Sequence, residues 1–532
     1  MKKIFWPLLI LFILALPLIY PFFTPGYFAT HDGEWAIVRL AEMHREVKDM
    51  QLPPRWSHYL NHGFGYPLFL FTYPFPYYAG EFLHLIGIGF TDTIKLIFIL
   101  SIVLSSITMY LLGNKYWGTW GGFISAVLFT FAPYRITNLF IRGSLGESLA
   151  TIYFPLLFYL LSELVVRPSR TIVTLTVFSL ATFILTHNAT VVLFLPVLLV
   201  WVILLLFQGK KISAKNIKIV SIAFILSLTL SAFFWLPALT EKKFVALSVT
   251  PLTDKTAHFL SMFELASTNT SNIFSDKPHL AIGLLQLVMI VAALLSLYTL
   301  FKLQKRKVFT SLAIFIIGFV SLGMVLPVSV YFWKLPLLKD IDFPWRMLSV
   351  SSFLLAFGSG IVGQLKWGKW ISLLVTIFAL VSFVLPPLTH INKGNDYYAT
   401  NDATTTSADE LMPIWVSIKP TNRSEDAYLL SSGAMQTLEK TSTIQNYEVA
   451  VSQSTEMMVN TVFFPGWRAS IDSYPTQIKI TPVGLMSLSI PPGEHQIRLQ
   501  FTNTPIRLIG NILSIGSLFV IVILWKFSKK IF

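Results

Sequence analysis

Apolar runs of about 20 residues recur along most of this chain, and no other feature of the sequence constrains its fold as strongly. A helix of about 20 apolar residues matches the thickness of the hydrocarbon core of a bilayer. Of the 532 residues, 54% are hydrophobic and only 12% are charged, about half of the charge expected for a soluble protein. The chain is therefore predicted to be a polytopic α-helical membrane protein.

Twelve spanning helices are expected, with both termini on one side of the membrane. The segments assigned to that side contain eighteen Lys and Arg residues and no Asp or Glu. Such an excess marks the cytoplasmic face by the positive-inside rule. The formal charge of +14 therefore reflects topology, and nucleic acid is not expected as a partner. The predicted spans are residues 4–23, 94–112, 118–136, 146–163, 171–187, 189–207, 219–239, 280–301, 309–328, 346–363, 371–387 and 507–525.

The first outer loop, residues 24–93, is long. It begins with a charged amphipathic stretch, EWAIVRLAEMHREVKDM, which is typical of a surface helix. An aromatic stretch at residues 63–87 follows, and it is apolar enough to be mistaken for a span. Because Pro67, Pro74 and Pro76 interrupt it, we expect this stretch to lie in the outer membrane interface, where Tyr and Phe are common.

Residues 388–506 differ in composition from the rest of the chain, with frequent Asp, Asn, Thr and Ser. Alternating runs such as NYEVAVSQ, LMSLSI and HQIRLQF lie between turn signals such as PPGEH. Strict alternation over short runs is typical of half-buried strands. A small extracytoplasmic β-sandwich is therefore predicted, followed by the final helix and a basic cytoplasmic tail at residues 507–532.

Ionisable residues gather at the outer ends of the predicted spans. Burying such groups at a membrane costs free energy unless they are paired or used for function. Because four clusters from distant parts of the chain fall on the same face, we expect them to converge on one site. The clusters are His31, Asp32 and Glu34; Arg135, Arg142 and Glu147; His187 and Asn188; and Asp340, Asp342 and Arg346, with Arg55, His58 and His62 as additional candidates.

Each cluster also has a structural explanation. Asp32 can cap the helix that begins near Gly33, which would leave its carboxylate no further role. Arg142 and Glu147 lie about one helical turn apart and can pair with each other. The remaining explanations are hydrogen bonding of a tight turn by His187 and Asn188, extension of Arg346 to lipid headgroups, and solvation of Asp340.

Motifs spread over nearly the whole chain carry a family resemblance. They are THDGEW (30–35), LPPRW (52–56), GFGYPLFLFTYPFPYY (63–78), YRITNLFIRGSLGESLA (134–150), DFPWR (342–346), FFPGWRASID (463–472) and IPPGEHQIRLQF (490–501). With them the chain resembles the bacterial membrane proteins called "6-pyruvoyl-tetrahydropterin synthase-related", which are among the GT-C-type glycosyltransferases. The last two motifs look like the outer β-domain of related membrane proteins. His58 departs from the pattern, where a carboxylate would be expected, and no zinc-ligating histidine set of a soluble pterin synthase is visible.

The resemblance implies a GT-C-type enzyme of the cell membrane that transfers a sugar from a polyprenyl-phosphate donor. Its transmembrane domain would span residues 1–387, surrounded by membrane lipids, and its acceptor would be an extracytoplasmic glycan, lipid or protein of the cell envelope. In such enzymes an acidic residue of the first outer loop is the catalytic carboxylate, and Asp32 is the matching position. Glu34 or His31 would tune or orient it. The aromatic residues of 63–80 would guide the isoprenoid chain, and the β-domain would bind acceptor glycan.

The expected chemistry agrees with this assignment. A sugar on a lipid phosphate carries its own leaving group, so the enzyme needs a base for the acceptor hydroxyl and cations for the departing phosphate. Arg142 and Arg346 are the candidates for the phosphate, because a guanidinium matches phosphate geometry. Arg55, Glu147 and His187 are expected to complete the substrate-binding site.

No metal is assigned to this site. The chain contains no cysteine, so disulfides, thiolate nucleophiles and cysteine-ligated metals are excluded. His31, Asp32 and Glu34 lack the spacing of a recognised metal site. A divalent metal therefore has no support from the sequence, although its involvement stays open.

Two other classes of function fit parts of the sequence. A transporter or flippase for lipid-linked saccharides would also have many helices and charged residues near the membrane. Transport sites usually lie near the middle of the bilayer, however, and ionisable residues are scarce there and abundant at one surface. A non-catalytic envelope assembly protein, with the β-domain as its working part, is the third class. The role of Asp32 distinguishes these classes from a transferase.

Overall fold

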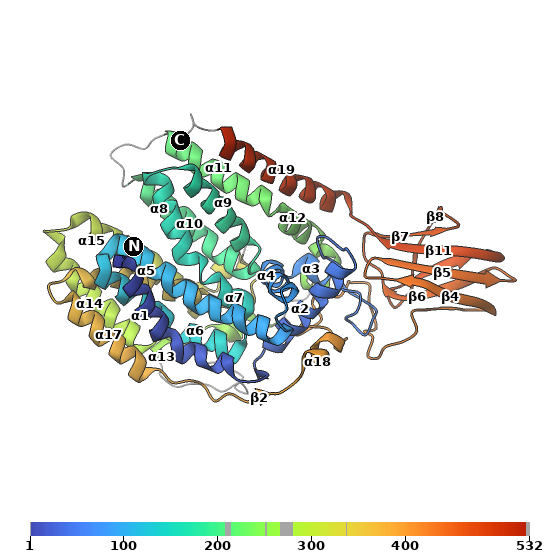
Figure 1. Cartoon of the computed structure of the whole chain (residues 1–532), viewed down its shortest axis with the longest axis horizontal. Helices are drawn as coiled ribbons and strands as arrows, with labels where there is room; N and C mark the ends of the chain where they lie inside the picture. The colour runs from blue at the N-terminus through green and yellow to red at the C-terminus, as the bar shows by residue number, and fades with distance from the viewer. Residues whose placement is uncertain (1, 208–213, 250–252, 267–279, 337, 528–532) are drawn as a thin grey trace.

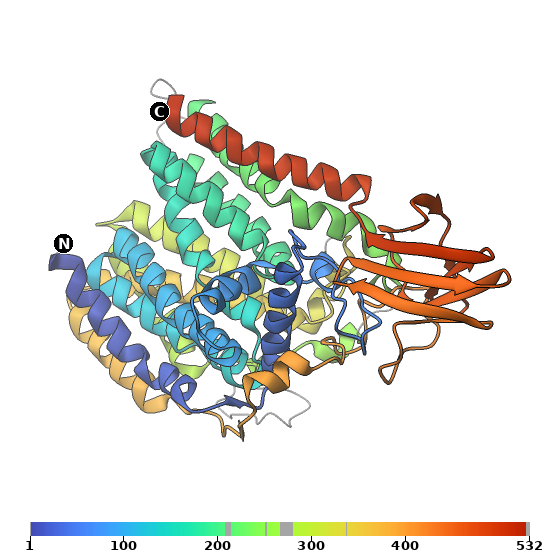
Figure 2. The same cartoon turned by 45° about the vertical axis from the view of Figure 1, so that its right-hand side comes forward.

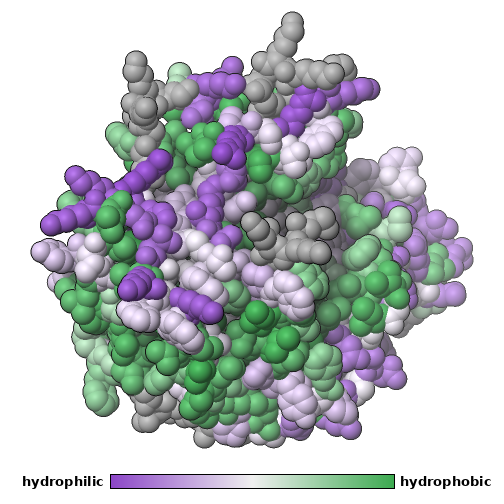
Figure 3. Space-filling view, turned by 60° about the vertical axis from the view of Figure 1, so that its left-hand side comes forward, coloured by the Kyte–Doolittle hydropathy of each residue, from purple (hydrophilic) through white to green (hydrophobic). Residues whose placement is uncertain are grey.

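The helical part of the molecule forms one body, and the C-terminal strands form a β-domain at one end of it (Figure 1). Hydrophobic side chains gather in the lower part of the face shown in Figure 3, which suits contact with lipid, whereas hydrophilic side chains gather at its upper left. The computed structural model describes residues 2–207, 214–249, 253–266, 280–336 and 338–527. Within these residues, eight helices are long and apolar enough to cross a membrane, or nine when one bent pair is counted as a span.

Each predicted span coincides with a helix or a pair of helices. Proline opens α19 without breaking it, because the first turn of a helix has no intrahelical partner for its N–H groups. The helices are α1 (Lys2–Ile19), α5 (Phe90–Thr130), α7 (Leu145–Ala150) with α8 (Tyr153–Val166), α9 (Arg170–Ile184), α10 (Asn188–Phe207), α11 (Ala214–Leu230) with α12 (Ala232–Glu241), α14 (Leu284–Phe301), α15 (Lys305–Gly323), α16 (Met347–Ser359), α17 (Gly368–Ser382) and α19 (Pro505–Phe527).

The expected count of twelve spans is not confirmed. Helices α9 and α17 have 15 residues each, which is short for a span, and α11 and α12 bend by 67° where one straight span was expected. The predicted span 94–112 and most of the predicted span 118–136 fall in α5, whose backbone breaks at Gly118 with φ 75°. A Cβ on Gly113 would lie 2.9 Å from Gly122 Cα, whereas a straight helix would separate these residues by about 13 Å. The two halves of α5 therefore fold back on each other.

The first outer loop contains α2 (Gly33–Lys48), α3 (Leu68–Phe71) and α4 (Phe75–Leu85). The amphipathic stretch forms α2, as predicted. The aromatic stretch divides into two parts: all four residues of α3 are buried, and Phe71 packs 6.3 Å from the ring of Phe464 near the β-domain, whereas Phe82 and Leu85 of α4 are 67% and 64% exposed. Aromatic rings pack as well against protein as in a membrane interface, so composition alone did not distinguish the two environments.

Two antiparallel sheets build the β-domain, in agreement with the predicted C-terminal β-structure. Their strand orders are β3-β6-β10-β9 and β4-β5-β11-β7-β8. In β5, Tyr447, Val449 and Val451 alternate with more exposed residues and point into the core. The strands are β3 (Ala427–Leu429), β4 (Gly433–Lys440), β5 (Ile444–Val451), β6 (Thr455–Val462), β7 (Trp467–Ile471), β8 (Tyr474–Thr476), β9 (Lys479–Ile480), β10 (Leu485–Ile490) and β11 (Gly493–Phe501).

Residues 388–426, between α17 and the first strand of the β-domain, return to the first outer loop (Figure 2). Strand β2 (His390–Ile391) pairs with β1 (Tyr27–Phe28), just before α2. Helix α18 (Asn395–Thr400) packs against α2. The strands of the two sheets thus occupy 427–501 of the segment that was predicted to form the β-domain, and residues 390–400 of that segment pair with β1 and pack against α2.

A buried ion pair fixes the β-domain to the helical body. Arg507 at the start of α19 is 0% exposed, and its Nη2 lies 2.7 Å from Glu241 Oε2 at the end of α12. The same nitrogen donates a hydrogen bond of 2.8 Å to the carbonyl of Pro465. Trp56 of the first outer loop packs its ring 5.3 Å from that of Phe501 in β11. The outer loop, the helices and the β-domain therefore meet at one junction.

Candidate active site

The site is built around a short segment between α5 and α7. Helix α6 (Pro133–Thr137) runs directly into η2 (Asn138–Arg142), a single π-type turn. Tyr134, Asn138 and Arg142 follow one another at intervals of four residues, which places them on one face of this segment. All three side chains are buried in the protein.

The backbone of the first outer loop is bonded to the end of this segment. The amide of His31 donates to the carbonyl of Ile141 at 3.0 Å, and the amide of Asp32 donates to the carbonyl of Arg142 at 2.8 Å. These bonds fix Asp32 beside Arg142, although the two residues are far apart in the sequence. The expected approach of Asp32 to Arg142 is therefore observed at the level of the backbone, whereas Arg135 of the second cluster donates to Ser105 Oγ at 2.7 Å and bonds elsewhere.

Asp32 occupies the N-cap position of α2, but its side chain makes no capping hydrogen bond. Thr30 fills that role instead, because its Oγ1 accepts a hydrogen bond of 2.9 Å from the amide of Gly33. Gly143 packs against this turn with φ +61°. A Cβ at this position would lie only 2.7 Å from the nitrogen of Gly33. Thr30 thus provides the capping hydrogen bond that was considered for Asp32. The half-buried carboxylate of Asp32 is not needed to cap the helix.

Arg142 forms a buried ion pair with Glu147 in α7. Its Nη1 lies 2.7 Å from Glu147 Oε2 and also donates to Asn138 Oδ1. The hydroxyl of Tyr134 donates to the other oxygen of Glu147, which is 0% exposed. The guanidinium lies 4.5 Å from the ring of Trp345. The pairing considered from the sequence is therefore real, and it belongs to a larger buried network.

The charge of Arg142 is held firmly by this network. Burial by itself disfavours the positive charge, but the carboxylate of Glu147 outweighs it, so the pKa of Arg142 lies above its ordinary value. Removing Glu147 would leave that charge buried without its partner.

Arg346 is the second cation of the site. It ends η8 (Pro344–Arg346), and its guanidinium packs 5.1 Å from the ring of Phe343. Its Nε is buried and has no hydrogen-bond partner within the part of the chain that the structure describes, where Arg346 also forms no ion pair. Asp32 and Arg142 are near enough to act electrostatically on this guanidinium. Among the residues that the structure describes, no carboxylate pairs with the positive charge of Arg346, and its packing against rings does not fit extension to lipid headgroups.

His187 lies between α9 and α10 on the same side of the molecule. Its Nδ1 is 2.7 Å from Thr190 Oγ1, and its ring lies 5.1 Å from that of Tyr73. Burial lowers the pKa of His187 to about 3, so the imidazole is neutral near pH 7. The neighbouring Asn188 donates to the carbonyl of Phe71 at 2.8 Å. His187 therefore bonds its own turn and faces the site as a neutral group, whereas Asn188 ties α10 to α3.

Two of the predicted site residues point elsewhere. Glu34 accepts hydrogen bonds from Lys393 at 3.0 Å and from the hydroxyl of Tyr398 at 3.1 Å, which directs it toward the return segment. Arg55 donates to Asn511 Oδ1 at 2.8 Å and lies at the junction with the β-domain. Their hydrogen bonds are with residues outside the site around Arg142. His31, the other predicted helper of Asp32, is exposed at the edge of the site.

The residues that the structure brings together come from several separate parts of the chain. Tyr73, Tyr134 and Trp345 were not expected among them, although the spacing of Tyr134 from Arg142 and the position of Trp345 next to Arg346 were visible signals. We refer to the group as the Arg142 cluster; it consists of Asp32, Tyr73, Tyr134, Arg142, Glu147, His187, Trp345 and Arg346.

The arrangement of the acidic and histidine side chains bears on metal binding. Within the described parts of the chain, no group of three or more His, Asp or Glu side chains is arranged to hold a metal ion. The cluster combines two guanidinium groups with two carboxylates, one of which is already paired. The guanidinium groups of such a set can bind an anionic ligand, and its other carboxylate can accept a proton. The set is less suited to binding a metal cation.

Comparison with known proteins finds a distantly similar sequence and a distantly similar structure among its matches. An uncharacterised protein of Lactococcus lactis subsp. cremoris is 27% identical over 245 residues, which cover 44% of this chain and 39% of that protein. The match therefore spans less than half of the length of the curated relative. The crystal structure of the apo oligosaccharyltransferase of Archaeoglobus fulgidus aligns with a TM-score of 0.38 and 13% identity, over 75% of this chain and 56% of the other. That score is below the level that identifies a shared fold.

A family model gives the clearer result. The model of the 6-pyruvoyl-tetrahydropterin synthase related domain, described as a membrane protein, matches residues 70–389. This range is more than half of the chain and includes all of the Arg142 cluster except Asp32. The chain belongs to the 6-pyruvoyl-tetrahydropterin synthase related family of membrane proteins.

Proposed function

We propose that this protein is a membrane glycosyltransferase of the GT-C type, which moves a sugar from a polyprenyl-phosphate donor to a hydroxyl of an extracytoplasmic acceptor. One observation carries the proposal. Thr30 caps α2, so the carboxylate of Asp32 is not used for capping, and the backbone amide of Asp32 donates to the carbonyl of Arg142. An acid that the fold does not use, held beside two guanidinium groups at the end of a membrane helix, is suited to catalysis.

The reaction follows from the positions of these charges. Asp32 accepts the proton of the acceptor hydroxyl as its oxygen attacks the anomeric carbon. The bond between that carbon and the phosphate oxygen breaks, and its electron pair leaves with the phosphate. Arg346 and Arg142 stabilise the negative charge that develops there. Attack from the side opposite the phosphate inverts the anomeric centre.

The two arginines have different parts in this scheme. Arg142 is neutralised by Glu147 and so contributes mainly orientation and hydrogen bonds, whereas Arg346 lacks a direct anionic partner among the described residues. A guanidinium without an anionic partner is stabilised most strongly by a phosphate, because the two groups can pair in a bidentate geometry. His187 is neutral near pH 7, which suits hydrogen bonding to a sugar hydroxyl rather than charge neutralisation.

Replacing Arg346 with glutamine is expected to lower kcat/KM for the lipid-phosphate donor by about 10²-fold, which corresponds to the loss of one charged hydrogen-bonding group. Replacement with lysine should restore part of the activity, because the charge returns without the bidentate geometry. Steady-state transfer assays on purified protein in liposomes measure both. Arg468→Gln, on an exposed position of β7, is the matched control, and an equal loss in that variant would contradict the assignment.

The sidedness of the molecule is part of the same proposal: the cell membrane holds both termini on its cytoplasmic side, and the site and the β-domain lie outside. The chain has no cysteine, so single cysteines can be labelled without further changes. Tyr474→Cys in β8 and Leu303→Cys between α14 and α15 are 78% and 81% exposed at the original side chains. A membrane-impermeant maleimide added to intact cells should label the first and reach the second only after permeabilisation. The reverse pattern would contradict the proposed orientation.

A further inference from the structure

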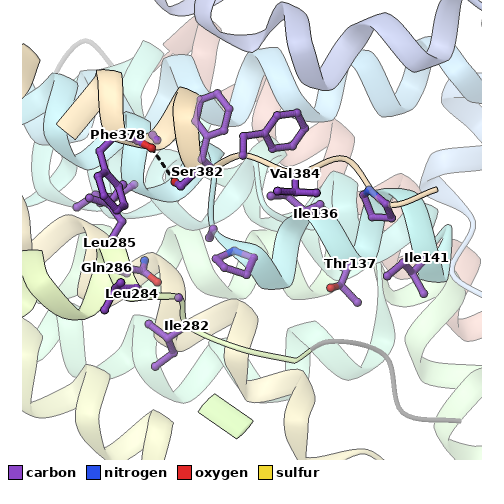
Figure 4. Close-up of a pocket in the computed structure, with 18 residues that line it drawn as sticks. Ile136, Thr137, Ile141, Ile282, Leu284, Leu285, Gln286, Phe378, Ser382 and Val384 are labelled. Carbon is purple, nitrogen blue, oxygen red and sulfur yellow. Dashed lines mark hydrogen bonds between the residues drawn. The ribbon is translucent and has the colours of Figure 1, made fainter. Parts of the chain in front are cut away.

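An apolar cavity of about 270 Å³ lies in the helical body, outside the Arg142 cluster (Figure 4). Its walls come from α6, from the start of α14 and from the end of α17, with Ile136, Leu284 and Phe378 as examples. No charged side chain lines it among the described residues. Of its few polar groups, Ser382 donates to the carbonyl of Phe378 at 2.6 Å and is thereby satisfied. The cavity is therefore suited to hydrocarbon.

The cavity and the Arg142 cluster share one wall. Tyr134 and Arg142 face the cluster, whereas Ile136, Thr137 and Ile141 of the same segment line the cavity. Figure 4 labels these three side chains among those that line the cavity. The ten residues of α6 and η2 thus separate a site suited to an anion from a cavity suited to an apolar chain.

We propose that this cavity binds part of the hydrocarbon tail of the same lipid whose phosphate contacts Arg346, an inference that rests on the proposed function. A molecule that carries a phosphate at one end and a long apolar chain at the other matches both faces of the shared segment. Phe69 and Phe71 of α3, which belong to the aromatic stretch expected to guide the isoprenoid, are buried and so do not offer such a surface. The cavity therefore makes the enzyme selective for donors with a long tail.

Photo-cross-linking tests the site without requiring catalysis. Phe378 lines the cavity, and Val381 lies one turn further along α17 with 79% of its side chain exposed. p-Benzoylphenylalanine at each position, in separate variants in liposomes, is irradiated with radiolabelled polyprenyl monophosphate. Cross-linking at 378 that exceeds that at 381 and is competed by unlabelled polyprenyl phosphate is the expected result. Equal labelling of both positions, or equal labelling at 378 by a phosphatidylglycerol probe, would show that the cavity takes bulk lipid and would overturn the proposal.

A kinetic test separates the tail site from the chemistry. Ala379 is 2% exposed and lines the cavity, so Ala379→Trp fills it. For a long-chain donor KM should rise by about tenfold or more, since displacing even a few buried methylene groups weakens binding by that factor. A donor with two isoprene units should be used equally well by this variant, the wild type and Val381→Trp. An equal loss for both donors would contradict the tail site. If polyprenyl phosphate cross-links at 378 while the wild type transfers no sugar, the proposed function fails and the lipid site stands.

Discussion

Asparagine in place of Asp32 is expected to slow sugar transfer by about 10²–10⁴-fold, the usual contribution of a general base, without unfolding the protein. The amide has nearly the same size as the carboxylate but cannot accept the proton of the acceptor hydroxyl. Folding should be unaffected because Thr30, and not Asp32, caps α2. Transfer from a polyprenyl-phosphate-linked sugar by purified protein in liposomes gives the rate, and thermal unfolding in detergent gives the stability.

Glu34→Gln is the matched control for this substitution. Glu34 lies two residues away and has a carboxylate of its own, but it is directed to Lys393 and Tyr398. Its replacement is expected to change the transfer rate by less than about threefold, because a partly exposed ion pair contributes little. Transfer by Asp32→Asn at the wild-type rate would contradict the assignment of the base. A wild type that moves lipid-linked saccharides across liposomes but transfers no sugar would instead favour a transporter.

Removing the carboxylate of Glu147 is expected to destabilise the protein by about 3–5 kcal/mol, which is typical of breaking a buried ion pair on one side. Glu147→Ala leaves the guanidinium of Arg142 buried without its partner and the hydroxyl of Tyr134 without its acceptor. Both groups then bear the cost of lost solvation. Unfolding of purified protein in detergent, followed by temperature or by denaturant titration, measures the change.

Two further variants show whether the loss has this origin. Glu163→Gln removes the carboxylate of the partly exposed Lys115–Glu163 pair and should cost no more than about 1 kcal/mol. The double variant Arg142→Met/Glu147→Met removes both charges, and it should recover much of the stability lost by Glu147→Ala while remaining inactive. If Glu147→Ala proved as stable as Glu163→Gln, the ion pair would not be the element that holds the site together.

The class of the protein and the approach of Asp32 to Arg142 were predictable from the sequence, whereas Arg135 and Asp340 of the same predicted clusters bond Ser105 and Lys242 instead. A bilayer requires apolar runs of a certain length and a one-sided distribution of Lys and Arg, so both are easily recognised in the sequence. Charges at membrane ends are rare enough that Asp32, Arg142 and Arg346 stood out. The number of spans was less predictable, because the bend between α11 and α12 and the shortness of α9 depend on packing.

The division of labour inside the site could not be predicted in the same way. Asp32 and Glu34 are equivalent by composition, and only the hydrogen bond from Gly33 to Thr30 and the pairing of Glu34 with Lys393 separate them. Arg55 resembled the other arginines near the membrane, yet tertiary contacts place it at the junction with the β-domain. Such choices depend on long-range contacts that leave no periodic signal.

Determining the structure of the protein with a polyprenyl-phosphate-linked sugar, or a non-reactive analogue, tests the central claim most directly. We expect the phosphate oxygens about 3 Å from the guanidinium nitrogens of Arg346 and Arg142, with the anomeric carbon turned toward the carboxylate of Asp32. A phosphate bound at the junction of Arg55 and Arg507, with no sugar near Asp32, would contradict the account.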